Sequence, residues 1–112
     1  MTVTLDHYLF LSAAVFAIGL FGALSRRGLV AVLLSIELML NAVNITFVAF
    51  SRYLDVPGSD QVATAGQLSG QVFALFVIAV AAAEAAVALA IILAVYRTRR
   101  TTNIEDVNTM KW

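Results

Sequence analysis

The fold is decided by residues 29–50, which read LVAVLLSIELMLNAVNITFVAF. This stretch contains one charged residue, Glu37, and is otherwise apolar enough to cross a bilayer, which takes about 20 residues of α-helix. An ionised carboxylate at the bilayer centre costs about 3 kcal/mol, so such a group needs a partner or a proton. The stretch therefore predicts a transmembrane helix with one unusual acid.

Two further apolar stretches flank this one along the chain. Residues 8–24 precede it, and residues 72–96 follow it and contain one acid, Glu84. Each is long enough to span a membrane. The sequence predicts an all-α membrane protein that forms a single domain over residues 1–112, with three transmembrane helices at 8–24, 29–50 and 72–96.

Composition excludes several classes of function. Of the 112 residues, 62% are hydrophobic and 12% are charged, whereas a soluble domain has about a quarter charged residues. The net charge of zero and the lack of a glycine-rich phosphate loop argue against binding of nucleic acids or nucleotides. Cysteine is absent and His7 is the one histidine, so we expect no disulfide, no iron–sulfur cluster, no metal site and no haem within this chain.

The distribution of basic residues predicts the orientation. Six of the seven lie on one side of the predicted spans, and one lies on the other. The basic side is the cytoplasmic one by the positive-inside rule. We therefore expect an external N-terminus, an outer loop at 51–71 that acts as a linker around the turn-forming pair Pro57 and Gly58, and a cytoplasmic tail at 97–112. The six residues on the basic side are Arg26, Arg27, Arg97, Arg99, Arg100 and Lys111.

The two acids in the spans are expected at matched depth. Glu37 lies nine residues beyond Gly28, or about 13 Å along a helix. Glu84 lies twelve residues before Tyr96, or about 18 Å from the same membrane face. The spacing places both carboxyl groups near the middle of the membrane.

Two amides accompany the first of these acids. At 100° per residue, about 40° separates Asn41 from Glu37, and Asn44 falls about 20° to the other side, so the three form one polar stripe. Ser35 and Thr46 point away from it and can bond carbonyl groups of their own helix. Two interpretations of the amides remain open, namely hydrogen bonds in packing and the holding of water.

Small residues predict where helices approach closely, since packing rather than hydrophobicity drives association in lipid. One face of the third span is a stripe of alanines, and small residues also recur on the first span. The first set is Ala79, Ala83, Ala86, Ala90 and Ala94, and the second is Ser12, Gly19 and Gly22.

Two interpretations of Glu37 and Glu84 also remain open. The carboxyl groups either exchange protons in a relay or stay protonated and serve as hydrogen-bonding groups between helices. Three helices cannot surround a polar pair on all sides, and contact of an acid with lipid is prohibitive. The residues themselves thus predict a proton-handling subunit of a larger membrane complex.

Two motifs carry a resemblance to a known family. Residues 35–44, SIELMLNAVN, residues 81–90, AAAEAAVALA, and the pair Arg26 and Arg27 resemble the K subunit of proton-pumping NADH:quinone oxidoreductase, respiratory complex I, whose mitochondrial counterpart is subunit 4L. The resemblance covers nearly the whole chain. Residues 70–73, GQVF, and 110–112, MKW, resemble the cyanobacterial and plastid branch, which takes electrons from ferredoxin.

The resemblance implies a non-redox subunit of an NAD(P)H- or ferredoxin:quinone oxidoreductase, located in the bacterial inner membrane or the thylakoid membrane. Its partners would be quinone-proximal and antiporter-like subunits, with quinone and redox centres held by partner subunits. Glu37 and Glu84 would belong to the axis that couples quinone reduction to proton movement, and Arg26 and Arg27 would match the family's cytoplasmic loop arginines. The alternatives are the C subunit of a multisubunit cation/proton antiporter, which generally lacks both acids, and a purely structural assembly subunit.

Overall fold

The computed structural model describes residues 2–53 and 62–108, with side chains described from residue 69 onward in the second range. Three long helices make up most of it, each long and apolar enough to cross a membrane. This confirms the expected all-α membrane fold. The helices are α1 (Leu5–Ser25), α2 (Leu29–Tyr53) and α3 (Val62–Arg99), followed by a short 3-10 helix, η1 (Ile104–Val107).

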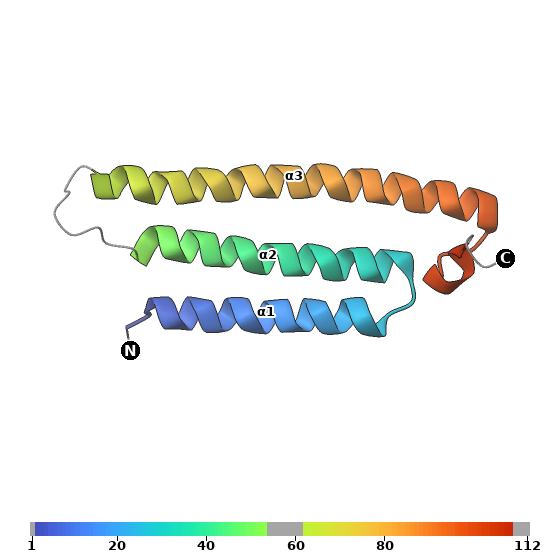
Figure 1. Cartoon of the computed structure of the whole chain (residues 1–112), viewed down its shortest axis with the longest axis horizontal. Helices are drawn as coiled ribbons and strands as arrows, with labels where there is room; N and C mark the ends of the chain where they lie inside the picture. The colour runs from blue at the N-terminus through green and yellow to red at the C-terminus, as the bar shows by residue number, and fades with distance from the viewer. Residues whose placement is uncertain (1, 54–61, 109–112) are drawn as a thin grey trace.

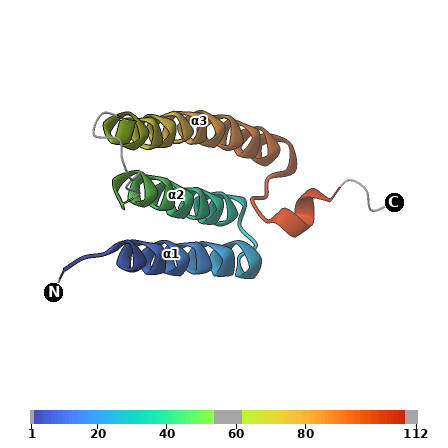
Figure 2. The same ribbon diagram turned by 60° about the vertical axis from the view of Figure 1, so that its left-hand side comes forward.

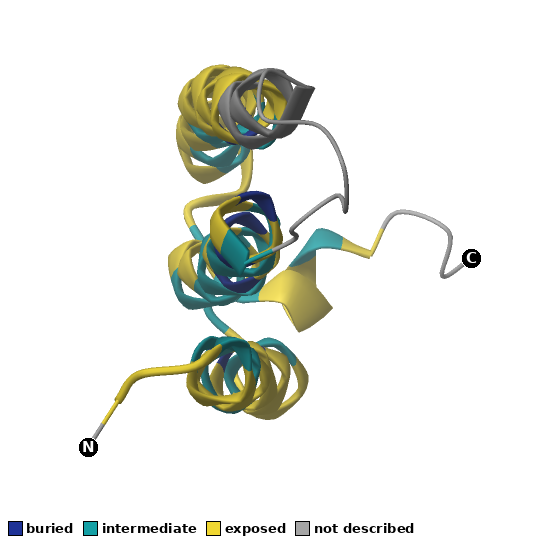
Figure 3. Ribbon diagram, turned by 90° about the vertical axis from the view of Figure 1, so that its left-hand side faces the viewer, coloured by how far each residue is buried: buried dark blue, intermediate teal, exposed yellow. Residues whose placement is uncertain are grey.

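The three helices lie side by side in a row, with α2 between α1 and α3 (Figures 1 and 2). The view along the helices in Figure 3 shows that they do not close into a triangular bundle, and that most of α3 is exposed. Within the described residues, this row leaves most of its two broad faces and the outer sides of α1 and α3 without a helix packed against them. Only the middle helix has packing partners on two sides.

The interface of α1 with α2 depends on glycine. A Cβ atom at Gly19 would lie 2.9 Å from the Ser35 carbonyl oxygen and 2.7 Å from Met39 Cγ, and one at Gly22 would collide with the Ser35 hydroxyl. Such contacts occur only where two helix backbones approach closely. The predicted role of the small residues on α1 is confirmed.

Hydroxyl groups add polar contacts to the same interface. The buried Ser12 Oγ lies 2.6 Å from both the Ala42 carbonyl oxygen and Thr46 Oγ1. Thr46 also donates to Ala42 O over 3.2 Å, and Ser35 donates to Ala31 O over 2.8 Å. Each hydroxyl therefore bonds a carbonyl of α2 in the apolar interior, as expected for Ser35 and Thr46.

The interface of α2 with α3 differs from the expectation. Among the side chains of α3 that the structure describes, Ala74 and Ala81 are buried, and the ring of Phe73 meets that of Phe47 edge-on, with centroids 5.1 Å apart. The alanine stripe predicted to pack, represented by Ala83 and Ala90, is exposed. These two alanines lie about 160–180° around the helix from Ala81. Alanine occupies both faces of α3, so spacing alone could not tell which face meets α2.

The helices are longer than the predicted spans. α2 continues to Tyr53 and α3 begins at Val62, so the linker expected over residues 51–71 is helical at both of its ends, whereas Pro57 and Gly58 lie outside the described residues. A helix satisfies its own backbone hydrogen bonds in water as well as in lipid. A fall in hydropathy therefore marks the edge of the membrane and does not mark the end of the helix.

The chain turns back after α3. Arg100 adopts φ 56°, in the left-handed region, and its N–H donates to Tyr96 O over 2.8 Å. The segment that follows, residues 101–107, lies beside the loop between α1 and α2, so this part of the tail is folded against the chain itself (Figure 1). Residues 109–112 of the expected cytoplasmic tail lie outside the described residues.

Candidate functional site

The antiparallel register of α2 and α3 puts the two intramembrane acids at one level. A Cβ atom at Gly70 of α3 would collide with the Ser51 side chain of α2, so these two positions face each other. Fourteen residues separate Ser51 from Glu37, and fourteen separate Gly70 from Glu84. Since both helices rise about 1.5 Å per residue from this common point, Glu37 and Glu84 lie at the same height.

The two acids differ in exposure. Glu37 is half-buried, whereas Glu84 is exposed. Glu84 lies about 60° around α3 from Ala81, on the flank of the contact with α2. Within the described part of the chain, neither carboxyl group has a hydrogen bond or an ion pair. Glu84 lines a groove of about 440 Å³ on α3, together with Val80, Ala83, Val87, Ala88 and Ile91.

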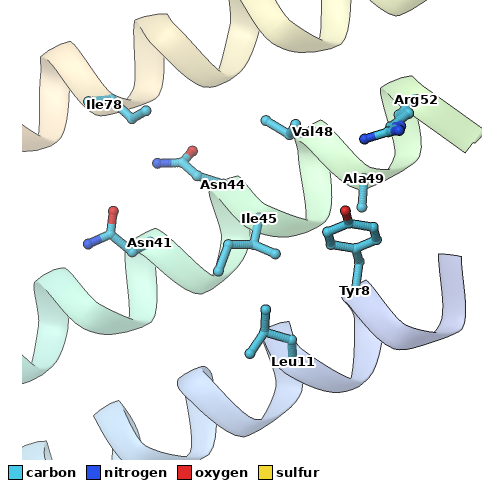
Figure 4. A pocket seen from close by; sticks show the side chains of 9 residues that line it. All are labelled: Tyr8, Leu11, Asn41, Asn44, Ile45, Val48, Ala49, Arg52 and Ile78. Atoms are coloured by element: carbon cyan, nitrogen blue, oxygen red, sulfur yellow. The ribbon is translucent and has the colours of Figure 1, made fainter. Parts of the chain in front are cut away.

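The two amides lie together in a second groove, of about 520 Å³, which involves all three helices (Figure 4). Leu11 comes from α1 and Ile78 from α3, while α2 contributes Asn41 and Asn44. Asn44 is only 6% exposed, and its Oδ1 has no hydrogen-bond partner among the described residues. A buried carbonyl oxygen without a hydrogen-bond donor is unfavourable, so a donor group that enters the groove could bond to Asn44 Oδ1.

We expect substitution of Asn44 by leucine to raise the free energy of unfolding of the isolated chain in detergent by about 1–3 kcal/mol, because the change removes a buried unpaired acceptor. The exposed Asn41 is the matched control, and Asn41→Leu should change stability by less than about 0.5 kcal/mol. The measurement is denaturant-induced unfolding in mixed micelles. A clear loss of stability in Asn44→Leu would mean that Oδ1 has a partner, such as water.

The structure brings together part of the predicted polar stripe. Asn41 and Asn44 line one groove, while Glu37 lies further along the same side of α2 and does not line it. Two further groove residues with polar groups, Tyr8 and Arg52, were not predicted as site residues from the sequence. The signal that could have marked Arg52 is its position, because it is the one basic residue on its side of the predicted spans.

The loop arginines lie apart from the acids. Arg26 and Arg27 are exposed in the α1–α2 loop, and Arg27 Nε lies 3.5 Å from Glu105 Oε1. Glu37 is ten residues from Arg27, or about 15 Å along α2. The two arginines therefore lie well away from Glu37, at the end of the helix pair where α2 begins.

Comparison with known proteins matches the chain over nearly its whole length. Residues 7–112 match the model of the family described as NADH-ubiquinone/plastoquinone oxidoreductase chain 4L. The chain is 51% identical to NADH-quinone oxidoreductase subunit K of Desulfitobacterium hafniense, over all of this chain and 98% of the relative.

Relatives named subunit 4L are equally similar. The chain is 54% identical to NAD(P)H-quinone oxidoreductase subunit 4L of the organellar chromatophore of Paulinella chromatophora, and 51% identical to subunit 4L of Synechocystis. Both alignments cover 100% of each chain. Similar identity to both groups of relatives does not separate the branches, so the resemblance to the cyanobacterial and plastid branch stays a prediction.

Proposed function

The chain belongs to the family of NADH-ubiquinone/plastoquinone oxidoreductase chain 4L, and from this premise we propose that Glu37 and Glu84 take part in coupling quinone reduction to proton translocation. As a member of this family the chain is a membrane-arm subunit of a complex I-type quinone oxidoreductase. The reaction itself belongs to the complex. This chain contributes groups that can hold a proton inside the membrane.

One observation carries the proposal, namely that two carboxyl groups lie at the same level of adjacent helices and that one of them is exposed on the chain surface. An exposed acid in lipid costs about 3 kcal/mol. Glu84 is therefore expected to face another subunit of the complex, where its proton can be exchanged. The row of three helices supports this, because it leaves the flank of α3 free for a neighbour (Figure 3).

Among the described residues, no hydrogen bond joins the two carboxyl groups, and the axes of helices in contact lie about 8–10 Å apart. Transfer requires water molecules or a side chain from a neighbouring subunit as a bridge. Asn41 and Asn44 lie on the Glu37 side of α2, and Asn44 Oδ1 can accept a hydrogen bond from such a water.

We also propose an orientation, a membrane and partner subunits for this chain. The excess of basic residues at one end of the chain favours a cytoplasmic position for the α1–α2 loop and the tail, with the N-terminus outside. The membrane would be the bacterial inner membrane or the thylakoid membrane. The partners would be quinone-proximal and antiporter-like subunits, which would hold the quinone and the redox centres, and Arg26 and Arg27 would face a partner at the cytoplasmic surface.

The antiporter alternative is not favoured, because the family match and the full-length relatives are those of quinone oxidoreductase subunits. The alternative of a purely structural subunit predicts that the protons on the acids never exchange.

We expect the double variant Glu37→Gln with Glu84→Gln to assemble with the complex and reduce quinone with loss of most proton pumping, since glutamine keeps the size and hydrogen bonds of the side chain without the titratable proton.

The measurement is dye-monitored proton uptake in membrane vesicles, normalised to the rate of electron transfer and to the amount of assembled complex. Co-purification of the tagged chain serves as the assembly control and identifies its partner subunits. Normal pumping by assembled complexes of the double variant would support the structural alternative and reject the relay.

A further inference from the structure

The tail segment, residues 101–107, makes backbone hydrogen bonds with the α1–α2 loop. The Leu29 N–H donates to Thr102 O over 2.8 Å, and the Ile104 N–H donates to Arg27 O over 2.8 Å. These two bonds flank the antiparallel bridge between Gly28 and Asn103. The end of α3 is thereby tied to the beginning of α2 at the basic end of the chain (Figure 2).

The first of these bonds caps α2. The four N–H groups that begin a helix have no acceptor within it, and at a membrane face they need one from elsewhere. Leu29 is the first residue of α2, and the residue before it, Gly28, has no side chain that could accept. The Thr102 carbonyl oxygen takes the place of a capping side chain.

One side-chain contact joins the tail segment to the α1–α2 loop, and others order the tail segment itself. Arg27 Nε lies 3.5 Å from Glu105 Oε1, and Thr101 Oγ1 donates to Asp106 Oδ2 over 3.0 Å. Asn103 Oδ1 accepts from Glu105 N over 3.1 Å and so fixes the turn that presents the glutamate. The ion pair is exposed and contributes little by itself, so the backbone bonds carry most of the connection.

Between Phe73 and the tail segment, the interface between α2 and α3 has only short buried side chains on α3 to resist lengthwise sliding. Among the described side chains of α3, the buried ones are Ala74 and Ala81, which are too short to interlock deeply with the ridges of α2. The closer contacts of the interface, Gly70 with Ser51 and Phe73 with Phe47, lie toward the other end of the two helices. Lengthwise sliding of α3 against α2 would separate the levels of Glu37 and Glu84. A tie between the end of α3 and the start of α2 opposes that sliding.

We propose that residues 101–107 act as a clasp that fixes the lengthwise register of α3 against α2, and with it the common level of Glu37 and Glu84. Leu29 and Ile104 are positioning residues through their N–H groups, and Glu105 is one through Arg27. The effect on pumping rests on the proposed function, whereas the clasp itself is a statement about the fold alone.

Proline substitution can delete the two bonds selectively. Leu29 begins α2 and Ile104 begins η1, and the first position of a helix tolerates proline because its N–H has no acceptor within the helix. Asn103 has φ −82° and ψ 125°, the extended conformation that a residue before proline prefers. The double variant Leu29→Pro with Ile104→Pro therefore removes both donors. The matched control is Leu29→Ala with Ile104→Ala, which shortens both side chains and keeps the N–H groups.

A disulfide can restore the connection. Gly28 and Asn103 form a pair without mutual hydrogen bonds, in which Cα atoms lie about 4.5 Å apart, within the range that a disulfide spans. A Cβ atom at Gly28 would make only an ordinary contact, 3.9 Å from Ala31 Cβ. The chain has no cysteine, so the variant Gly28→Cys with Asn103→Cys introduces the only two thiols of this subunit.

The experiment uses the assembled complex in its membrane. We expect the cysteine pair to form a disulfide within the chain under mild oxidation and to pump normally. In the proline variant, the amides of residues 101–107 should exchange with solvent roughly tenfold faster than in the alanine control. Protons pumped per electron should fall in the proline variant at unchanged assembly, and the disulfide added to that variant should restore them under oxidising conditions and not after reduction.

Three results would overturn the clasp: no disulfide between the two cysteines, exchange of the tail as slow in the proline variant as in the control, or normal pumping with the tail released. The last result, combined with loss of pumping in the double glutamine variant, would reject the clasp and keep the proposed function. Normal pumping in the double glutamine variant would reject the proposed function, while exchange and disulfide formation would still decide whether the clasp exists.

Discussion

Glu37→Gln alone is expected to slow coupled proton pumping by about 10²-fold, the lower end of what a positioned proton-transferring group contributes. Glutamine can keep the hydrogen bonds that a protonated glutamate makes, so assembly and electron-transfer capacity should remain. Glu84→Gln should give a similar or milder loss, because Glu84 is exposed on the chain and a neighbouring subunit can supply part of its surroundings. Proton uptake and quinone reduction measured on the same vesicles give the coupling ratio.

Glu37→Asp is the matched control for this prediction. It keeps the titratable carboxyl group and shortens the side chain by one methylene, so pumping should be reduced less than in Glu37→Gln. A further control is Asp6→Asn, which removes an exposed carboxyl group in the first turn of α1. Equal pumping by the glutamine variant and the unsubstituted chain would contradict a role of Glu37 as a proton carrier.

Gly19→Leu is expected to prevent normal packing of α1 on α2. A Cβ atom there would lie 2.9 Å from the Ser35 carbonyl oxygen, which belongs to the backbone and cannot rotate away. The helices must separate, at a cost of about 3 kcal/mol or more, and the bonds of Ser12 across the same interface should be lost. The amount of this subunit in the assembled complex, measured by quantitative immunoblotting of membranes, should fall strongly.

Two further substitutions make this prediction specific. Gly28→Ala is the control, since its Cβ atom would make only an ordinary contact at 3.9 Å, and normal assembly is expected. Gly22→Ala should be harmful by itself, because the side chain of Ser35 is in the way, and Ser35→Gly should rescue it. The same rescue should fail for Gly19→Leu, where the obstacle is backbone. Normal assembly of Gly19→Leu would show that the two helices are not in this close contact.

Several features of the candidate site followed from residue spacing. The position of Glu37 within one apolar stretch and of Glu84 within another was enough to predict their depth, because helical rise is the same in every helix. The stripe that joins Glu37 with Asn41 and Asn44 likewise depends only on 100° per residue. The role of the two acids in proton transfer stays a prediction, because protonation depends on neighbouring subunits.

The packed face of α3 and the surroundings of Asn44 could not be predicted from residue spacing. The alanines of α3 follow helical spacing on both faces, so choosing between the face with Ala81 and the face with Ala90 required the packed structure. The unpaired Oδ1 of Asn44 results from the surroundings that α1 and α3 create around it. Spacing within one helix contains no information on either point.

The sequence by itself determined that this protein is a set of three membrane helices with one acid in each of two of them, because hydropathy is a local property of the chain. The tertiary structure alone decided that the helices lie in a row, that Glu84 is exposed beside α2, and that residues 101–107 bond to the start of that helix. These features depend on contacts between segments far apart in sequence. Such contacts depend on complementary packing and on backbone hydrogen bonds between distant segments, so a local sequence pattern does not predict them.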